Sequence, residues 1–190
     1  MTTKEDLVLV DNQNRYGWIS IALHWICALI IFGLFGLGIY MTGLDYYSPW
    51  YHRGPALHIA MGILIFSLML WRLIWRIKST SPAPVPGQSA AAVNAAKLIK
   101  FALYALVFLV CISGYLVTTA EGKGASFFDW FSIPAITELS PEVADAAEEI
   151  HEIVAWTIMI LVALHAGAAL LHHFVFRDKT LTRMLTPNQK

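Results

Sequence analysis

Four long apolar stretches dominate the chain and are separated by polar or mixed segments. They cover approximately residues 18–42, 56–77, 98–119 and 150–176. Each reaches the ~20 residues that a helix needs to cross the hydrocarbon core of a bilayer. Because backbone groups in lipid must be hydrogen-bonded within each span, four such stretches predict an all-α fold, a transmembrane four-helix bundle. We expect residues 1–190 to form a single membrane domain.

The composition supports a membrane protein with several spans. Hydrophobic residues make up 57% of the 190 positions and charged residues only 14%, which is too apolar for an ordinary soluble domain. The first stretch is too long for a signal peptide and is followed by further spans, so we expect no cleaved leader.

Lysine and arginine are distributed unevenly between the connections. Eleven of the 13 lie before the first stretch, around the link between the second and third, or after the fourth: Lys4, Arg15, Arg72, Arg76, Lys78, Lys97, Lys100, Arg177, Lys179, Arg183 and Lys190. Only Arg53 and Lys123 lie in the other two connections. Because basic residues mark the cytoplasmic side of a membrane protein, we expect both termini in the cytoplasm.

The opposite, outer side is acidic. Its nine carboxylates are Asp45, Glu121, Asp129, Glu138, Glu142, Asp145, Glu148, Glu149 and Glu152. The net charge of zero therefore conceals a strong asymmetry between the two faces of the membrane, and we expect no nucleic-acid partner.

Boundary signals mark two of the predicted helices, and one outer segment is unusual. Pro55 suits the first turn of the second helix. Ser140 and Pro141 suit the N-cap and the first position of the fourth. The segment "ASFFDWFSIPAI", residues 125–136, is apolar and aromatic but too short to span, so we expect it to lie flat in the outer interface.

Histidines occur at matched depths in the apolar stretches. His24 lies six residues after Trp18, about 9 Å along a helix, and His165 lies 12 residues before Arg177, so both fall in the cytoplasmic half. His58 and His151 fall near the outer ends of their helices. A buried imidazole in lipid needs a partner, and ionisable groups at such depths are usually functional. The chain therefore offers two pairs, His24 with His165 and His58 with His151.

The rotation around the fourth helix agrees with this pairing. His151 and His165 are 14 residues apart, which gives about 21 Å of rise and about 40° of rotation. One helix face therefore presents an imidazole toward each side of the membrane. His172, seven residues further on, falls on the same face.

Two facing imidazoles in a bundle can hold a metal centre. Zinc usually takes four ligands, and no carboxylate lies near His24 or His165, whereas haem iron needs only axial ligands. Glycines could make room for a flat macrocycle or permit close helix packing: Gly33, Gly36, Gly38, Gly62 and Gly167. Cys27 and Cys111 are in no CxxC or CxxCH motif, so we expect neither thiolate metal binding nor covalent haem attachment.

The segments "ALHW" (22–25), "ALHIAMG" (56–62), "EEIHE" (148–152) and "LHAGAALLHHF" (164–174) resemble the bacterial cytochrome b561 family. The similarity runs from about residue 15 to the "DKTLTRM" tail. It implies a membrane cytochrome b domain in the bacterial inner membrane with two non-covalent b haems, each held by two histidines. Transferred by motif, the ligands are His24 and His165 for the inner haem, and His58 and His151 for the outer haem.

The resemblance also implies a quinone, ubiquinone or menaquinone, reacting near the inner haem at the position of His172. A titrating imidazole suits that chemistry because quinone reduction takes up protons. Candidate partners of the haem propionates are Arg53 and Tyr51 outside, and Arg15 and Arg72 inside.

Three functions are compatible with two stacked haems. The first is electron transfer between the quinone pool and a periplasmic redox or quinone-binding protein. The second, known in the family, is a superoxide oxidase that passes electrons to ubiquinone. The third is a haem b anchor subunit of a membrane dehydrogenase. An anionic substrate favours a positive entrance, so the acidic outer face favours the first function. Whether the chain is an oxidoreductase in its own right stays open.

Overall fold

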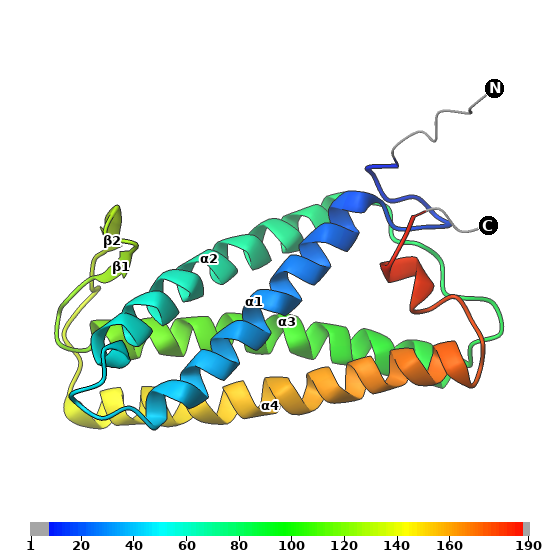
Figure 1. The fold of residues 1–190 in the computed structure, drawn as a ribbon. Coiled ribbons are helices and arrows are strands. Elements are labelled where there is room, and N and C mark those ends of the chain that lie inside the picture. The colour runs from blue at the N-terminus through cyan, green and yellow to red at the C-terminus, as the bar shows by residue number, and fades with distance from the viewer. Residues whose placement is uncertain (1–7, 188–190) are drawn as a thin grey trace.

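Four long helices form an elongated bundle in the computed structural model, which describes residues 8–187 (Figure 1). They are α1 (Trp18–Thr42), α2 (Trp50–Lys78), α3 (Ala90–Thr119) and α4 (Pro141–Phe174). All four are long and apolar enough to cross a membrane. The prediction of a transmembrane four-helix bundle is therefore confirmed. Lys4 and Lys190, two of the basic residues counted above, lie outside the described residues.

The helices pack in chain order. Extensive contacts join α1 with α2, α2 with α3, and α3 with α4, whereas α1 and α4 are not among the extensively packed pairs. The chain begins and ends at one end of the bundle, and the connection after α3 lies at the other (Figure 1). We call these the termini end and the hairpin end.

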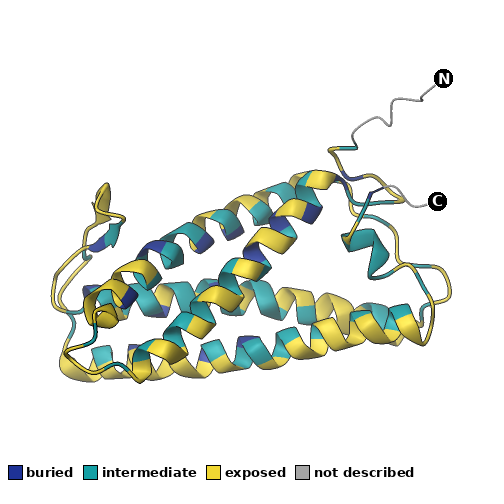
Figure 2. Cartoon of the chain, in the orientation of Figure 1, coloured by how far each residue is buried: buried dark blue, intermediate teal, exposed yellow. Residues whose placement is uncertain are grey.

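A narrow core fills the middle of the bundle, and most of the helix surface is exposed (Figure 2). The buried cluster consists of Cys27, Ile65, Met69, Val107, Val154 and Ile158. The outward faces carry large apolar side chains, such as Leu29, Phe101 and Ile77, which is 75% exposed. Lipid tails are as apolar as these side chains, so this surface suits a bilayer and not water.

The helix starts differ from the apolar stretches. α1 coincides with the predicted stretch, whereas α2 and α3 begin six and eight residues before their apolar stretches. α4 begins nine residues before its apolar stretch, at the start that the boundary signals predicted. Ser89 caps α3 by accepting a hydrogen bond from the Ala92 N–H at 3.2 Å, and α4 begins with Ser140 at the N-cap followed by Pro141, as predicted. The extra turns lie outside the apolar stretches, where hydropathy carries no signal for a helix.

Pro55 does not start α2, so that prediction was wrong. The helix begins at Trp50, with Pro49 at the N-cap and Pro55 inside it. The Ser48 hydroxyl accepts a hydrogen bond from the Trp50 N–H at 3.3 Å. Pro55 is the sixth residue of α2, beyond the first N–H groups that have no helical acceptor, so it leaves one carbonyl of the first turns without its helical hydrogen bond.

The aromatic segment after α3 forms a β-hairpin within residues 125–136, and its position in the outer interface stays a prediction. Strands β1 (Ala125–Phe127) and β2 (Phe131–Ile133) pair antiparallel, with Ala125 opposite Ile133. Phe128 and Asp129 have positive φ values of 49° and 59°, as the central residues of a type I′ turn require. Backbone N–H and C=O groups of the two strands thereby form hydrogen bonds with each other.

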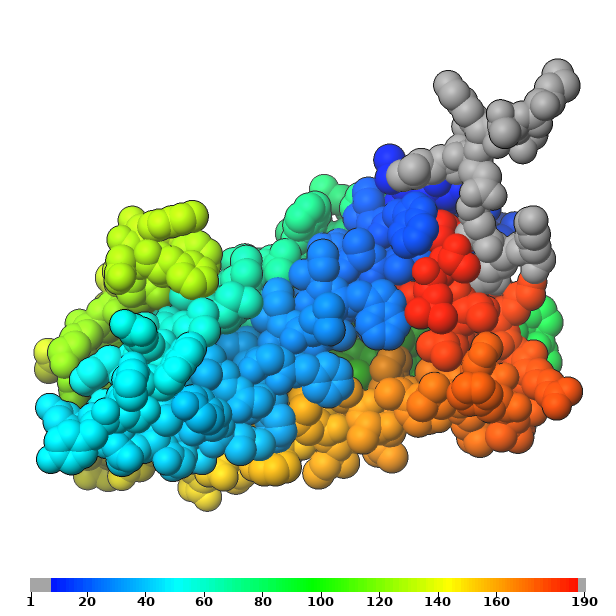
Figure 3. All heavy atoms as spheres, viewed as in Figure 1, coloured from blue at the N-terminus to red at the C-terminus, as the bar shows by residue number. Residues whose placement is uncertain are grey.

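The C-terminal segment folds back onto the start of α1 (Figure 3). It contains a short 3₁₀ helix, η1 (Thr182–Met184). The Trp25 indole donates to the Met184 carbonyl at 2.7 Å, and Arg183 Nη1 donates to the Ala83 carbonyl at 2.7 Å. The tail therefore ties α1 to the link between α2 and α3.

Asp11 organises the chain before α1. Its buried carboxylate accepts hydrogen bonds from the Gly17 N–H at 2.7 Å and the Ser20 hydroxyl at 2.6 Å. A side chain at Gly17 would have its first carbon 2.3 Å from the Leu9 carbonyl oxygen, so only glycine fits this close approach.

We expect Asp11→Ala to lower the free energy of unfolding by about 1–2 kcal/mol, because it removes a cap at the start of α1. Thermal unfolding of the detergent-solubilised protein measures the change. Glu149→Ala, an exposed carboxylate on α4, is the matched control and should change stability by less than about 0.5 kcal/mol. Equal effects of the two variants would contradict the capping role.

Candidate functional site

α1 and α4 bring the rings of His24 and His165 together toward the termini end. Their ring centroids are 6.4 Å apart with an angle of 70° between the ring planes. Arg72 of α2 lies against the pair, with Nη2 3.0 Å from Nδ1 of His24, and its guanidinium packs over the Tyr104 ring at 5.4 Å. The inner pair therefore has a cation beside it but no carboxylate among its described contacts.

α2 and α4 bring His58 and His151 together toward the hairpin end, with ring centroids 6.1 Å apart and an angle of 66°. His151 Nδ1 lies 2.9 Å from the Val110 carbonyl oxygen and 3.3 Å from the Ser113 hydroxyl. A carbonyl only accepts, so Nδ1 of His151 carries the proton and Nε2 keeps its lone pair. His58 Nδ1 is buried without a hydrogen-bond partner among the described residues.

The spacing of both pairs fits a metal ion between the rings. An imidazole nitrogen binds a metal at about 2.0–2.1 Å, so two rings on opposite sides of one ion have centroids about 6 Å apart. Edge-to-face ring contact occurs at the same separation, so the spacing alone does not select a metal. Within residues 8–187 no group of three or more His, Cys, Asp and Glu side chains gathers, which leaves two-ligand centres.

Glycines leave space around the rings. An added methyl group would meet no atom within 4 Å at Gly33, Gly36, Gly62 or Gly167, and at Gly38 it would lie 3.6 Å from Cε1 of His58. With α1 and α4 in little direct contact, this space suits a flat macrocycle. The structure is therefore compatible with glycines that leave room for a cofactor. Close packing against a neighbouring helix is not observed at the four glycines with no atom within 4 Å.

Gly114 of α3 is a site residue that sequence reasoning missed. A methyl group there would lie 2.8 Å from Cε1 and 3.0 Å from Nδ1 of His151. α3 contains no histidine, so its sequence offers no candidate metal ligand. A glycine directly after a serine in an apolar stretch was the available signal, and it is a weak one.

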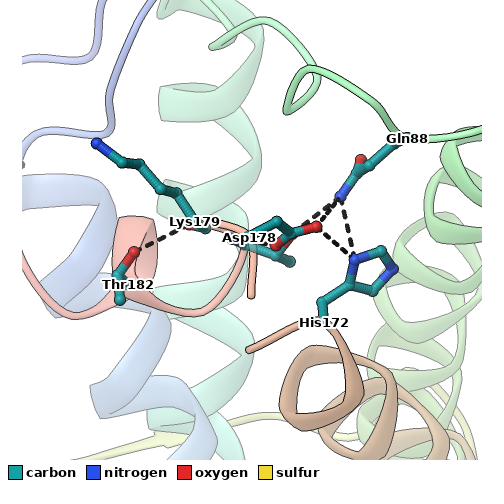
Figure 4. A network of polar contacts seen from close by, with 6 residues as sticks. Gln88, His172, Asp178, Lys179 and Thr182 are labelled. Atoms are coloured by element: carbon teal, nitrogen blue, oxygen red, sulfur yellow. Dashed lines mark hydrogen bonds and ion pairs between the residues drawn. The ribbon is translucent and has the colours of Figure 1, made fainter. Parts of the chain in front are cut away.

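His172 joins a polar network at the termini end (Figure 4). Its Nδ1 lies 2.5 Å from Oδ2 of Asp178, and Gln88 Nε2 donates to the same oxygen at 3.2 Å. Gln88 Nε2 also donates to the Thr180 hydroxyl at 2.9 Å. Sequence reasoning selected His172 but missed Asp178 and Gln88, because nothing local links the latter two to a histidine on α4.

Asp178 is held as a carboxylate. Burial raises the pKa of its carboxyl, but hydrogen bonds from Thr180, His172 and Gln88 more than offset burial. The pKa of Asp178 therefore lies well below its ordinary value, and the group is ionised at physiological pH.

The other predicted site residues are more peripheral. Arg53 and Tyr51 are exposed in the first turns of α2. Arg15 donates to the Pro187 carbonyl at 3.5 Å and lines a cationic cavity of about 370 Å³ with Lys179 and Arg183. Of the two arginines predicted for the inner side, the structure brings Arg72 to the histidine pair.

A bundle of four apolar helices with facing histidine pairs near both ends defines an integral, multi-pass membrane protein of the electron-transfer cytochrome type. A family model described as prokaryotic cytochrome b561 matches residues 15–187. The chain belongs to this family.

Two relatives come from Escherichia coli (strain K12). "Cytochrome b561 homolog 2" is 44% identical and covers 92% of this chain and 93% of its own length. "Cytochrome b561 homolog 1" is 32% identical over 94% of this chain and 100% of its own length. A third, "Probable superoxide oxidase CybB" of Yersinia pestis, is 28% identical over 91% of this chain and 97% of its own. The family implies b-type haem and membrane electron transfer.

We expect Gly114→Ala to displace the His151 ring and to lower the haem content of the purified protein. The methyl group cannot lie 2.8 Å from a ring carbon, so the ring or α3 must shift. The ratio of haem absorbance to protein measures the change. Gly43→Ala, whose methyl group would lie 3.8 Å from the nearest atom, should keep the wild-type ratio. Wild-type haem content in Gly114→Ala would show that His151 does not need this space.

Proposed function

We propose that the chain binds two b haems and carries electrons between the membrane quinone pool and a periplasmic redox partner. His24 and His165 would hold one haem, and His58 and His151 would hold the other. The observation that carries the proposal is the presence of two histidine pairs toward opposite ends of the bundle of a b561-family chain, with ring separations of 6.4 and 6.1 Å that one metal ion would fit. An iron with two histidine ligands has no open position, so it supplies electron transfer without binding substrate.

The surrounding residues orient the ligands. The Val110 carbonyl holds the Nδ1–H of His151 at 2.9 Å, which fixes the ring and directs its Nε2 lone pair to the metal; such outer contacts tune a ligand's basicity. Arg72 is our candidate for the inner propionate because it already lies against His24. Arg15 and Arg53 are secondary candidates at the two ends.

We infer the orientation of the bundle in the membrane from the distribution of its lysines and arginines, which favour the cytoplasmic side. With the termini end in the cytoplasm, the inner pair lies beside the tail and His172, where a quinone, ubiquinone or menaquinone, would exchange electrons. The two pairs are separated by about 21 Å along α4, so together they span most of a ~30 Å hydrocarbon core. Electrons thus cross the membrane between a quinone site on one side and a partner site on the other.

The hairpin end favours a protein partner over superoxide. Lys123, one of the two basic residues expected there, pairs with Glu121 at 2.8 Å, and both side chains are exposed. That pairing leaves Arg53 to attract an anion against the surrounding carboxylates, whereas an acidic face suits a neutral or basic protein. Superoxide oxidation is the second candidate, supported by the Yersinia pestis relative's name. A haem b anchor subunit is the third.

We expect His24→Ala or His165→Ala to remove one haem, and His58→Ala or His151→Ala to remove the other. Each change takes away one of two axial ligands and leaves the other pair intact. Extracted haem per protein should fall from two to one. His52→Ala, an exposed histidine of α2 outside both pairs, should retain two. Two haems in any of the four ligand variants would overturn the assignment.

Electron transfer between quinone and a periplasmic protein is distinguished from superoxide oxidation by the molecule that reduces the haem. We expect quinol to reduce the haem in the purified oxidised protein, and superoxide generated in the cuvette to leave its absorbance unchanged. A rapid haem reduction by superoxide, followed by reduction of added ubiquinone, would establish the second candidate and refute the charge argument. Superoxide dismutase is the control, since it must abolish any superoxide-dependent signal.

A further inference from the structure

The chain reverses direction directly after α4 and returns a carboxylate to the last turn of that helix. Arg177 has a positive φ of 52°, and the Asp178 N–H donates to the His172 carbonyl at 3.0 Å. The Asp178 side chain thereby lies against the His172 ring on the termini end (Figure 4). Non-glycine residues seldom adopt this left-handed conformation, so the turn is a specific device that places Asp178.

We propose that Asp178 is a positioning residue that prepares His172 to exchange a proton with the quinone. This inference rests on the proposed quinone site at His172 and adds a residue that neither the motifs nor the relatives assign. The proposal depends on the 2.5 Å contact between Nδ1 of His172 and Oδ2 of Asp178.

The contact with Asp178 determines which nitrogen of the His172 ring is available for proton transfer. An ionised carboxylate can only accept hydrogen bonds, so Nδ1 of His172 must donate its proton to Asp178. Nε2 is then the nitrogen that exchanges protons, and it points away from Asp178 and Gln88 (Figure 4). A carboxylate that holds one imidazole nitrogen and leaves the other for proton transfer is a recurrent arrangement in enzymes.

The Asp178 carboxylate accepts hydrogen bonds from Gln88 and Thr180 as well as from His172. Gln88 Nε2 donates to Oδ2 at 3.2 Å, and the Thr180 N–H donates to Oδ1 at 2.8 Å. The side chains of His172 and Asp178 are only 19% and 14% exposed. Water competes weakly with hydrogen bonds at such exposure, so the orientation of the imidazole is maintained. Gln88 comes from the link between α2 and α3, and the site therefore joins three segments.

The proton balance of the step is simple. Reduction of a quinone to a quinol takes two electrons, which the cytochrome supplies, and two protons. One O–H bond forms at the quinone carbonyl beside His172 as the Nε2–H bond of the imidazolium breaks. Water supplies the proton for the other carbonyl and then reprotonates Nε2. Asp178 stays ionised throughout and stabilises the imidazolium. Quinol oxidation reverses each transfer.

His172 lies close enough to the inner pair for this coupling. It is seven residues after His165, about 10 Å along α4 and on the same helix face. The Phe176 ring packs near it, with ring centroids 5.1 Å apart. A quinone ring beside Nε2 would thus meet an apolar side chain and a proton donor together.

The test compares Asp178→Asn, Asp178→Glu and His172→Ala with the wild-type holoprotein. The reduced protein is mixed with a short-chain ubiquinone in a stopped-flow instrument, and haem oxidation is followed over a range of quinone concentrations in H₂O and D₂O. We expect Asp178→Asn to lower the maximal rate about 10- to 100-fold, as loss of an orienting carboxylate does elsewhere. The half-saturating quinone concentration and the haem spectrum should not change.

Two further readouts separate positioning from a structural role. The solvent isotope effect should increase in Asp178→Asn because proton transfer becomes slower, and Asp178→Glu should recover most of the rate because it restores a carboxylate. Asp129→Asn, the same substitution in the hairpin turn, is the matched control and should behave as wild type.

Each other outcome overturns the inference in a distinguishable way. If His172→Ala slows the reaction but Asp178→Asn does not, the quinone site stands and the role of Asp178 is wrong. If Asp178→Asn changes only the half-saturating concentration, Asp178 serves binding and not proton transfer. If His172→Ala and Asp178→Asn both react as wild type, or the wild type does not react, the proposed quinone site fails as well.

Discussion

An imidazole ring at membrane depth needs a partner, and this requirement organises the bundle. Without one, a polar ring in an apolar bundle costs several kcal/mol. His151 obtains a hydrogen bond from the Val110 carbonyl, but His58 has a buried, unpartnered Nδ1 among the described residues. In the proposed function, the pairs on α1, α2 and α4 offer their remaining nitrogens to haem iron. The open space at the glycines and the sparse contact between α1 and α4 would accommodate the macrocycle.

The two ends of the bundle differ in their polar groups. At the termini end, the tail, the link between α2 and α3, and α4 meet in a network of hydrogen bonds around Asp178. Such a network can hold a proton-exchanging group in one orientation. At the hairpin end, the exposed carboxylates and the Glu121–Lys123 pair present an acidic surface. A quinone that exchanges protons suits the first end, and a protein that exchanges only electrons suits the second.

Helix geometry explains how much could be predicted from the sequence. The rise and turn of an α-helix are constants, so counting residues from Trp18 and Arg177 was enough to match His24 with His165, and the structure brings these rings together. The bounds of α1 were predicted for a similar reason, since lipid demands an unbroken apolar stretch. The starts of α2 and α3 lie outside the apolar stretches, where hydropathy does not report helix, and they were misplaced. The start of α4 also lies outside its apolar stretch, but Ser140 and Pro141 marked it correctly.

Features that depend on chain reversals could not be predicted. The β-hairpin at residues 125–133 requires positive φ at Phe128 and Asp129, and phenylalanine is not a typical residue for that turn. The contact of Asp178 with His172 depends on a similar conformation at Arg177. Gly114 matters only through a ring on another helix. In each case the deciding interaction joins segments whose local sequence does not indicate it.

The central claim is that the two histidine pairs are two separate haem sites. The most direct measurement is the number of non-covalently bound b haems per chain in the purified wild-type protein, combined with electron paramagnetic resonance of the oxidised state. The account predicts two haems per chain, both low-spin because two imidazoles bind each iron. One haem per chain, or a high-spin iron with an open position, would contradict it.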